Sequence, residues 1–143
     1  MTAWLRQFCI HVSDLDATIK FYETLGLECT SRTPINDDVT EAMIENPERG
    51  AWIQLAHDKT IKGPIDLGNA VWKLYIYTDD CRGLYDRAMA AGYKSVTPPV
   101  KYDRWPTTVA YIQDPDGYLV EFVQRDERPT GRTPGGSPRD QAL

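Results

Sequence analysis

The sequence is poor in cysteine and in long hydrophobic runs. Its three cysteines, Cys9, Cys29 and Cys81, cannot all pair, and their spacing matches no zinc motif, so we expect a reduced chain located in the cytoplasm. No apolar stretch approaches the roughly 18 residues that a membrane span needs. The N-terminal segment enters a strand pattern at once, and we therefore expect no signal peptide.

Positive charge is also scarce. The chain has 16 Lys and Arg residues against 21 Asp and Glu residues, a formal net charge of -5. Without a basic face, neither nucleic acid nor an anionic membrane is an expected partner. What remains is 143 residues, of which 41% are hydrophobic and 26% charged, an ordinary composition for one soluble globular domain.

Two stretches of the sequence resemble each other, VSDLDATIKFYETLGL in the first half and TDDCRGLYDRAMAAGY in the second. Asp14 in the first aligns with Asp80 in the second, and Gly26 aligns with Gly92. An Asp at the start and a Gly at the end are typical of helix caps, and the apolar residues between them recur at helical spacing. The sequence therefore predicts an internal repeat in which each copy contains an amphipathic helix.

Segments with strand patterns surround each predicted helix. In the first copy they are 7–12, 27–32, 41–45 and the turn and strand of 46–56; in the second they are 73–78, 93–97, 107–113 and the turn and strand of 114–124. We divide the chain into a first βαβββ module (1–56), a linker (57–70), a second βαβββ module (71–124) and a flexible tail rich in Pro and Gly (125–143).

The predicted fold class is α+β. The two modules would join their sheets and curl them around a central cavity, with the helices outside. Alternation within the strands predicts which side chains face that cavity. In DPDGYLVEFVQR the carboxylate of Glu121 interrupts the apolar run of a predicted strand.

These residues resemble the vicinal oxygen chelate superfamily, which includes glyoxalase I, bleomycin-resistance proteins and extradiol dioxygenases. The resemblance is carried by VSDLDATIKFYETLGL, by TDD…AAGY and by DPDGYLVEF, and it covers residues 5 to 124. It implies the fold just described, a protein that binds a small organic ligand, and a homodimer that can build each cavity from two chains.

The resemblance also implies four metal ligands, two from each half, at Gln7, Gln54, Lys73 and Glu121. A protonated lysine has no lone pair and repels a dication, and two neutral amides add weak ligands. We therefore expect no metal and no other cofactor, with a divalent metal as the less favoured alternative. Lys73 and Glu121 are instead expected to form a partly buried ion pair, which is either structural or part of the site.

The predicted cavity face also collects ligand-binding candidates. They are Gln7, His11, Trp52, Gln54, Tyr75, Tyr77 and Tyr111, together with Arg104 and Trp105 in a loop framed by prolines. Aromatic walls with a few polar groups suit a flat or partly apolar organic ligand.

Two functions follow from this pattern, and the sequence leaves open whether the protein is an enzyme. One is a glyoxalase-like or epimerase-like lyase or isomerase without a metal, in which Glu121 moves a proton next to a carbonyl group and Lys73 stabilises the enolate. The other is a binder that sequesters an aromatic or amphipathic molecule, as bleomycin-resistance proteins do.

Overall fold

The computed structural model describes residues 1–3, 5–103 and 106–126. The first half contains β1 (Gln7–His11), α1 (Leu15–Thr24), β2 (Glu28–Pro34), β3 (Val39–Glu45) and β4 (Trp52–Asp58). The second half contains β5 (Leu74–Tyr77), α2 (Cys81–Ala90), β6 (Lys94–Tyr102), β7 (Thr107–Gln113) and β8 (Leu119–Arg125). Arg104, Trp105 and the predicted tail beyond residue 126 lie outside the described residues.

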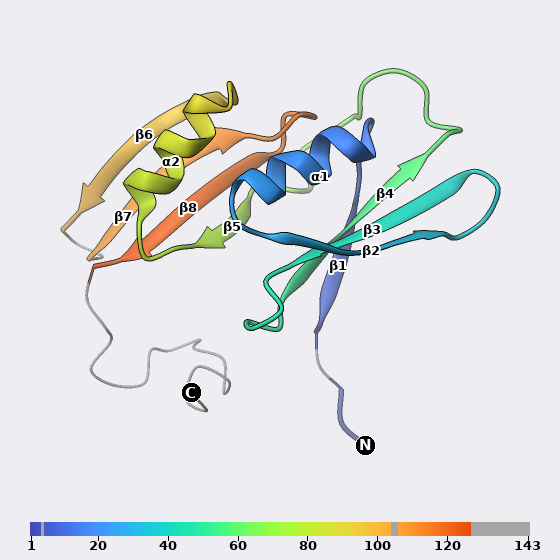
Figure 1. The fold of residues 1–143 in the computed structure, drawn as a ribbon, viewed down its shortest axis with the longest axis horizontal. Coiled ribbons are helices and arrows are strands. Elements are labelled where there is room, and N and C mark those ends of the chain that lie inside the picture. Colours follow the sequence, from blue (N-terminus) through green and yellow to red (C-terminus); the bar gives the residue numbers. More distant parts are fainter. Residues whose placement is uncertain (4, 104–105, 127–143) are drawn as a thin grey trace.

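The two halves form two four-stranded mixed sheets with the same strand order, β1-β4-β3-β2 and β5-β8-β7-β6 (Figure 1). In each sheet the first strand pairs in parallel with the last, and the other pairs are antiparallel. The predicted fold class, α+β with two βαβββ modules, is confirmed.

The two helices begin and end in the same way. The Asp14 carboxylate accepts a hydrogen bond from the backbone N–H of Ala17 at 2.9 Å, and Asp80 accepts one from Gly83 at 2.8 Å. Gly26 and Gly92, which follow the two helices, both have a φ of 87°. A residue with a Cβ adopts this left-handed conformation at a cost, so glycine is favoured there.

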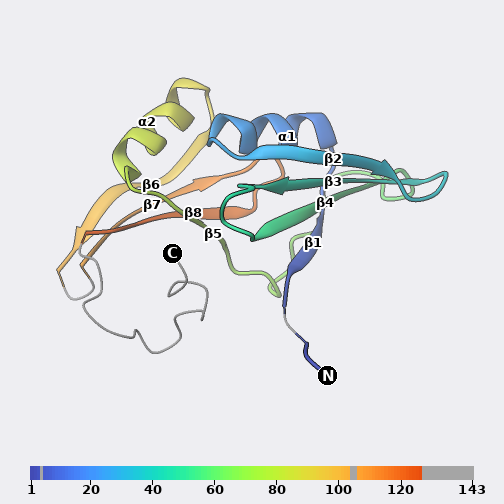
Figure 2. The ribbon, with the colours of Figure 1, turned by 60° about the horizontal axis from the view of Figure 1, so that its bottom comes forward.

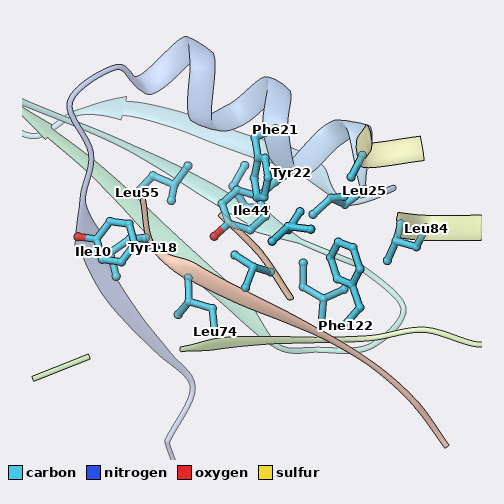
Figure 3. Packing of buried hydrophobic residues seen from close by; sticks show 14 of the residues in the cluster. Ile10, Phe21, Tyr22, Leu25, Ile44, Leu55, Leu74, Leu84, Tyr118 and Phe122 are labelled. Atoms are coloured by element: carbon cyan, nitrogen blue, oxygen red, sulfur yellow. The ribbon is translucent and has the colours of Figure 1, made fainter. Parts of the chain in front are cut away.

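One hydrophobic core serves both modules. Phe21 and Tyr22 of α1 belong to the same buried cluster as Leu55 of β4 and Phe122 of β8, and Figure 3 shows these side chains converging beneath α1. Both helices lie on one side of the sheets (Figure 2). The alternating side chains of the strands therefore face either this core or the opposite, helix-free side, which we call the open face.

A polar latch also joins the modules. The turn before β8 brings the Asp116 carboxylate to Ser13, where it accepts hydrogen bonds from the backbone N–H at 3.0 Å and from the hydroxyl group. The Tyr118 hydroxyl donates to the backbone carbonyl of His11 at 2.9 Å. These contacts tie the closing strand of the second module to the first strand of the first.

The sheets of the single chain are not closed, so the expected central cavity is not enclosed by the described residues. Tyr75 and Tyr77, which were expected to line that cavity, are 54% and 60% exposed. A hollow of about 350 Å³ lies instead beside the N-terminal end of α2, lined by Leu25 and Asp80 among others. The alternation of a strand fixes which face a side chain takes but not how two sheets lean together, which explains the difference.

No helix in the described part of the chain combines the length and the apolar character that crossing a membrane requires.

Candidate functional site

The second sheet carries a cluster of three polar side chains on its open face. Glu121 lies in the middle of β8, between Val120 and Phe122, both of which are fully buried in the core. Its neighbour across the antiparallel pair is Tyr111 of β7. Lys73 precedes β5, the strand that pairs with β8 on the other side. Strand register places Tyr111 beside Glu121, and Lys73, directly before β5, lies next to them.

The cluster is compact and largely removed from water. Lys73 Nζ lies 2.6 Å from Glu121 Oε2, and both side chains are 8% exposed. The Tyr111 hydroxyl donates to Glu121 Oε1 at 2.9 Å and accepts from Lys73 Nζ at 3.3 Å. Glu121 Oε2 has no hydrogen bond of favourable angle among the described residues, so the approach of Lys73 is mainly a contact between charges.

Aromatic rings surround the ammonium group of Lys73. Its Nζ lies 4.2 Å from the centroid of the Trp72 ring, 4.9 Å from that of Tyr75 and 5.3 Å from that of Tyr111. The negative faces of such rings attract a cation, so they add to the stabilisation given by Glu121. The sequence predicted Tyr75 and Tyr111 as site residues but missed Trp72, because that residue precedes the alternating strand.

The surroundings keep Lys73 charged. Burial opposes its charged form, but the close contact with the Glu121 carboxylate and the hydrogen bond to Tyr111 outweigh burial and raise the pKa of Lys73. Burial and the hydrogen bond to Glu121 also raise the pKa of Tyr111. Lys73 therefore stays an ammonium group and Tyr111 a neutral phenol at pH 7.

The open face of the first sheet carries a chain of hydrogen bonds. The Trp52 indole N–H donates to Gln7 Oε1, and Gln7 Nε2 donates to Gln54 Oε1 at 2.6 Å. Gln54 Nε2 then donates to Glu41 Oε2 at 2.7 Å. We call these four side chains the amide relay. Glu41 was not predicted as a site residue from the sequence, because it lies outside the repeated segments and is not one of the four positions implied by the family resemblance.

The remaining candidates are more dispersed. His11 is exposed at the end of β1, and its contact with the second module uses its backbone carbonyl. Tyr77 lies near Arg125, whose guanidinium carbon is 5.3 Å from the centroid of the ring. Arg104 and Trp105 lie outside the described residues, and their predicted contact with a ligand stays a prediction.

Comparison with known proteins identifies the family. The model of the Glyoxalase/Bleomycin resistance protein/Dioxygenase superfamily matches residues 4–122. This chain belongs to that superfamily. The match spans both modules up to the middle of β8, and it includes Gln7, Gln54, Lys73 and Glu121.

Similar proteins carry one recurrent name. A probable lactoylglutathione lyase of Vibrio parahaemolyticus is 32% identical over 127 residues, which cover 85% of this chain and 91% of that protein. A lactoylglutathione lyase of Haemophilus influenzae is 28% identical over 127 residues, which cover 85% and 93% of the two chains. The crystal structure of glyoxalase I from Zea mays superimposes with a TM-score of 0.76 at 29% identity, over 87% of this chain. This chain matches only 45% of the maize chain.

These relatives correct the expectation that no cofactor is bound. Lactoylglutathione lyases are typically metal-dependent, so the absence of a cofactor was wrongly expected from the residue types at four positions. The fit within one chain is nevertheless poor. Among the described residues no group of three or more His, Cys, Asp and Glu side chains is arranged to hold a metal ion. Lys73 Nζ occupies the position beside Glu121 that a metal bound to this carboxylate would take.

Proposed function

We propose that this chain is a glyoxalase-type enzyme, a lyase or isomerase that moves a proton next to the carbonyl group of a small organic substrate. One observation carries the proposal. The buried cluster of Lys73, Tyr111 and Glu121 occupies the open face in a chain whose relatives are named lactoylglutathione lyases. The substrate class we propose is an adduct of glutathione with a 2-oxoaldehyde.

In the proposed reaction Glu121 acts as the base. In this adduct the carbon next to the carbonyl bears both the sulfur and a hydroxyl group. The Glu121 carboxylate takes the proton from that carbon, and the electron pair of the C–H bond forms the enolate. The hydroxyl proton then passes to the enolate oxygen while Glu121 returns its proton to the former carbonyl carbon, which leaves a thioester. An ion-paired carboxylate is a weaker base, so the Lys73 ammonium must turn from Glu121 toward the enolate oxygen. Its flexible four-carbon stem allows that movement. Tyr111 remains as the hydrogen-bond donor that orients Glu121.

Substitution of Glu121 by Gln tests the proposal. Glu121→Gln keeps an acceptor for Tyr111 but removes the base, so we expect kcat for formation of S-lactoylglutathione to fall by about 100-fold or more. Glu28→Gln, an exposed change on β2, is the control and should leave kcat unchanged. Because the variant leaves Lys73 without its counter-charge, its melting temperature is measured in parallel. A folded Glu121→Gln protein with full activity would refute the proposed role.

A binding protein is the second candidate. Tyr75 and Tyr77 leave more than half of their surface exposed on the open face, where a flat organic ligand could stack on them. Absence of turnover in both the natural protein and Glu121→Gln, with equal binding of S-hexylglutathione by calorimetry, would favour this function over catalysis.

We also propose that the protein is cytoplasmic and forms a homodimer, and the open faces support the dimer. Each sheet holds half of the candidate site, the amide relay on one and the Lys73 cluster on the other. In a dimer that opposes the first sheet of one copy to the second sheet of the other, the two halves would meet around one ligand.

A further inference from the structure

We infer that Trp52 and Glu41 are positioning residues that fix the direction of the hydrogen bonds through Gln7 and Gln54. Neither terminal residue is one of the four ligand positions of the superfamily. Both side chains are partly buried on the open face, at opposite ends of the amide relay. The inference rests on the proposed function only for its effect on catalysis.

The two ends of the relay have fixed hydrogen-bonding roles. An indole N–H can only donate a hydrogen bond, and an ionised carboxylate can only accept one. Trp52 must therefore meet the carbonyl oxygen of Gln7, and Glu41 must meet the amino group of Gln54. The middle bond then has one possible direction, from the Gln7 amino group to the Gln54 carbonyl oxygen at 2.6 Å.

Without those ends, the relay has no preferred direction. The amide group of a glutamine has an oxygen and a nitrogen of nearly equal size, and a half-turn of the group exchanges donor and acceptor. Two adjacent glutamines can thus form the same hydrogen bond in either sense. Either terminal residue alone still selects one sense, because each imposes the same direction on the pair between them.

A fixed direction matters to a ligand. The relay uses one N–H and one carbonyl lone pair of each amide, which leaves one N–H and one lone pair on each for other partners. With the direction fixed, these free groups keep constant positions on the open face. A substrate then meets a preorganised pattern of donors and acceptors and does not have to select it on binding.

The experiment is a double-mutant cycle between the two ends. Trp52→Phe removes the donor but keeps a ring, and Glu41→Gln keeps the shape but replaces a pure acceptor with an amide. We expect each single variant to retain the separate, hydrogen-bonded side-chain amide signals of Gln7 and Gln54 in nitrogen–proton NMR spectra. In the double variant the side-chain amide signals of both residues should move to the chemical shifts of a glutamine whose amide group turns freely.

Kinetics give a second readout. For the proposed reaction, each single variant raises KM by some factor over the natural protein. The factor for the double variant should exceed the product of the two single factors by about fivefold or more, while kcat changes little. Trp52→Phe combined with Glu45→Gln is the matched control. Glu45 lies on β3, as Glu41 does, and is the residue in register with Trp52 of β4. This control should behave as Trp52→Phe alone.

Three results would overturn the inference: unchanged amide signals in the double variant, the same movement of the signals in either single variant, or the same movement in the control. The NMR readout needs no turnover. An inactive natural protein would therefore count against the proposed function and leave the direction of the relay to be decided by the spectra.

Discussion

Asp114 is a carboxylate that the fold holds away from water. It is 5% exposed, and burial raises its pKa to about 6, although its Oδ1 accepts hydrogen bonds from the backbone N–H groups of Asp116 and Tyr118. The negative charge of Asp116 adds to the rise. The other oxygen, Oδ2, and the nearby Tyr22 hydroxyl have no hydrogen-bond partner among the described residues.

This carboxylate should make the protein less stable as the pH rises. Its pKa in the folded state lies above the ordinary value of 3.8, so the folded state binds the proton more tightly. Stability is therefore lost between about pH 4 and pH 6 and stays low above that range. A rise of about two pKa units corresponds to about 3 kcal/mol.

Asp114→Asn should remove this dependence. Asn keeps the acceptor for both backbone N–H groups but cannot ionise. The free energy of unfolding of the variant minus that of the natural protein should therefore be about 3 kcal/mol larger at pH 8 than at pH 4. Urea titrations at both pH values measure the change. Asp86→Asn, an exposed change on α2, serves as control, and equal pH dependence in all three proteins would contradict the prediction.

Single residues also show what the sequence could and could not predict. The placement of Glu121 opposite the core follows from the alternation of β8, and Lys73 follows from the repeat. Glu41 could not be found in that way. The residue in register with Gln54 is Met43, and Glu41 reaches Gln54 diagonally from two residues along β3. Such a contact depends on the pairing register and side-chain rotamers, which a pattern of apolar residues does not specify.

At the scale of elements, the repeat predicted the helices well. Asp14 and Asp80 cap the two helices, and Gly26 and Gly92 end them, as the aligned sequences indicate. Capping depends on local chemistry within a few residues, so it can be derived from short stretches. The polar latch between Ser13 and Asp116 joins residues 103 apart, and nothing local to either residue predicts it.

The two glycines allow a matched test at this scale. A Cβ at Gly92 would meet nothing within 4 Å, and at Gly26 it would meet only an Arg87 nitrogen at 3.9 Å. Alanine at either position should therefore cost only the strain of the left-handed backbone, about 1 kcal/mol. Thermal unfolding of Gly26→Ala and Gly92→Ala should give equal losses, and a loss in one variant alone would show that another interaction dominates.

At the scale of the whole molecule, the sequence predicted two modules with helices outside but also an enclosed cavity. The modules follow from the repeat. The closure does not, because the angle between two sheets depends on packing at their junction and on contacts with other chains. The open faces leave Tyr75 and Tyr77 exposed, which is an unusual position for two aromatic residues on one short strand.

The proposed dimer makes a prediction at the same scale. Light scattering during size-exclusion chromatography should give twice the chain mass of 16.2 kDa. Tyr77→Glu places a charge on the open face of the second sheet and should yield the monomer. Ile35→Glu, at an exposed site between β2 and β3, should leave the dimer intact. If the natural protein is monomeric at 100 μM, a dimer with a dissociation constant below about 100 μM is excluded.

The parallel pairing of β1 with β4 has a consequence for the order in which a module folds. β2, β3 and β4 pair with their neighbours in the sequence, so they can associate by closing short loops. β1 pairs with β4, which begins about 45 residues later in the chain, as the contact between Gln7 and Trp52 illustrates. It can therefore pair only after a much longer loop has closed. We expect the antiparallel strands to form early and the first strand to dock last. Gln7, and by the same topology the segment that bears Lys73, would then join the site only when the rest of its module is already folded.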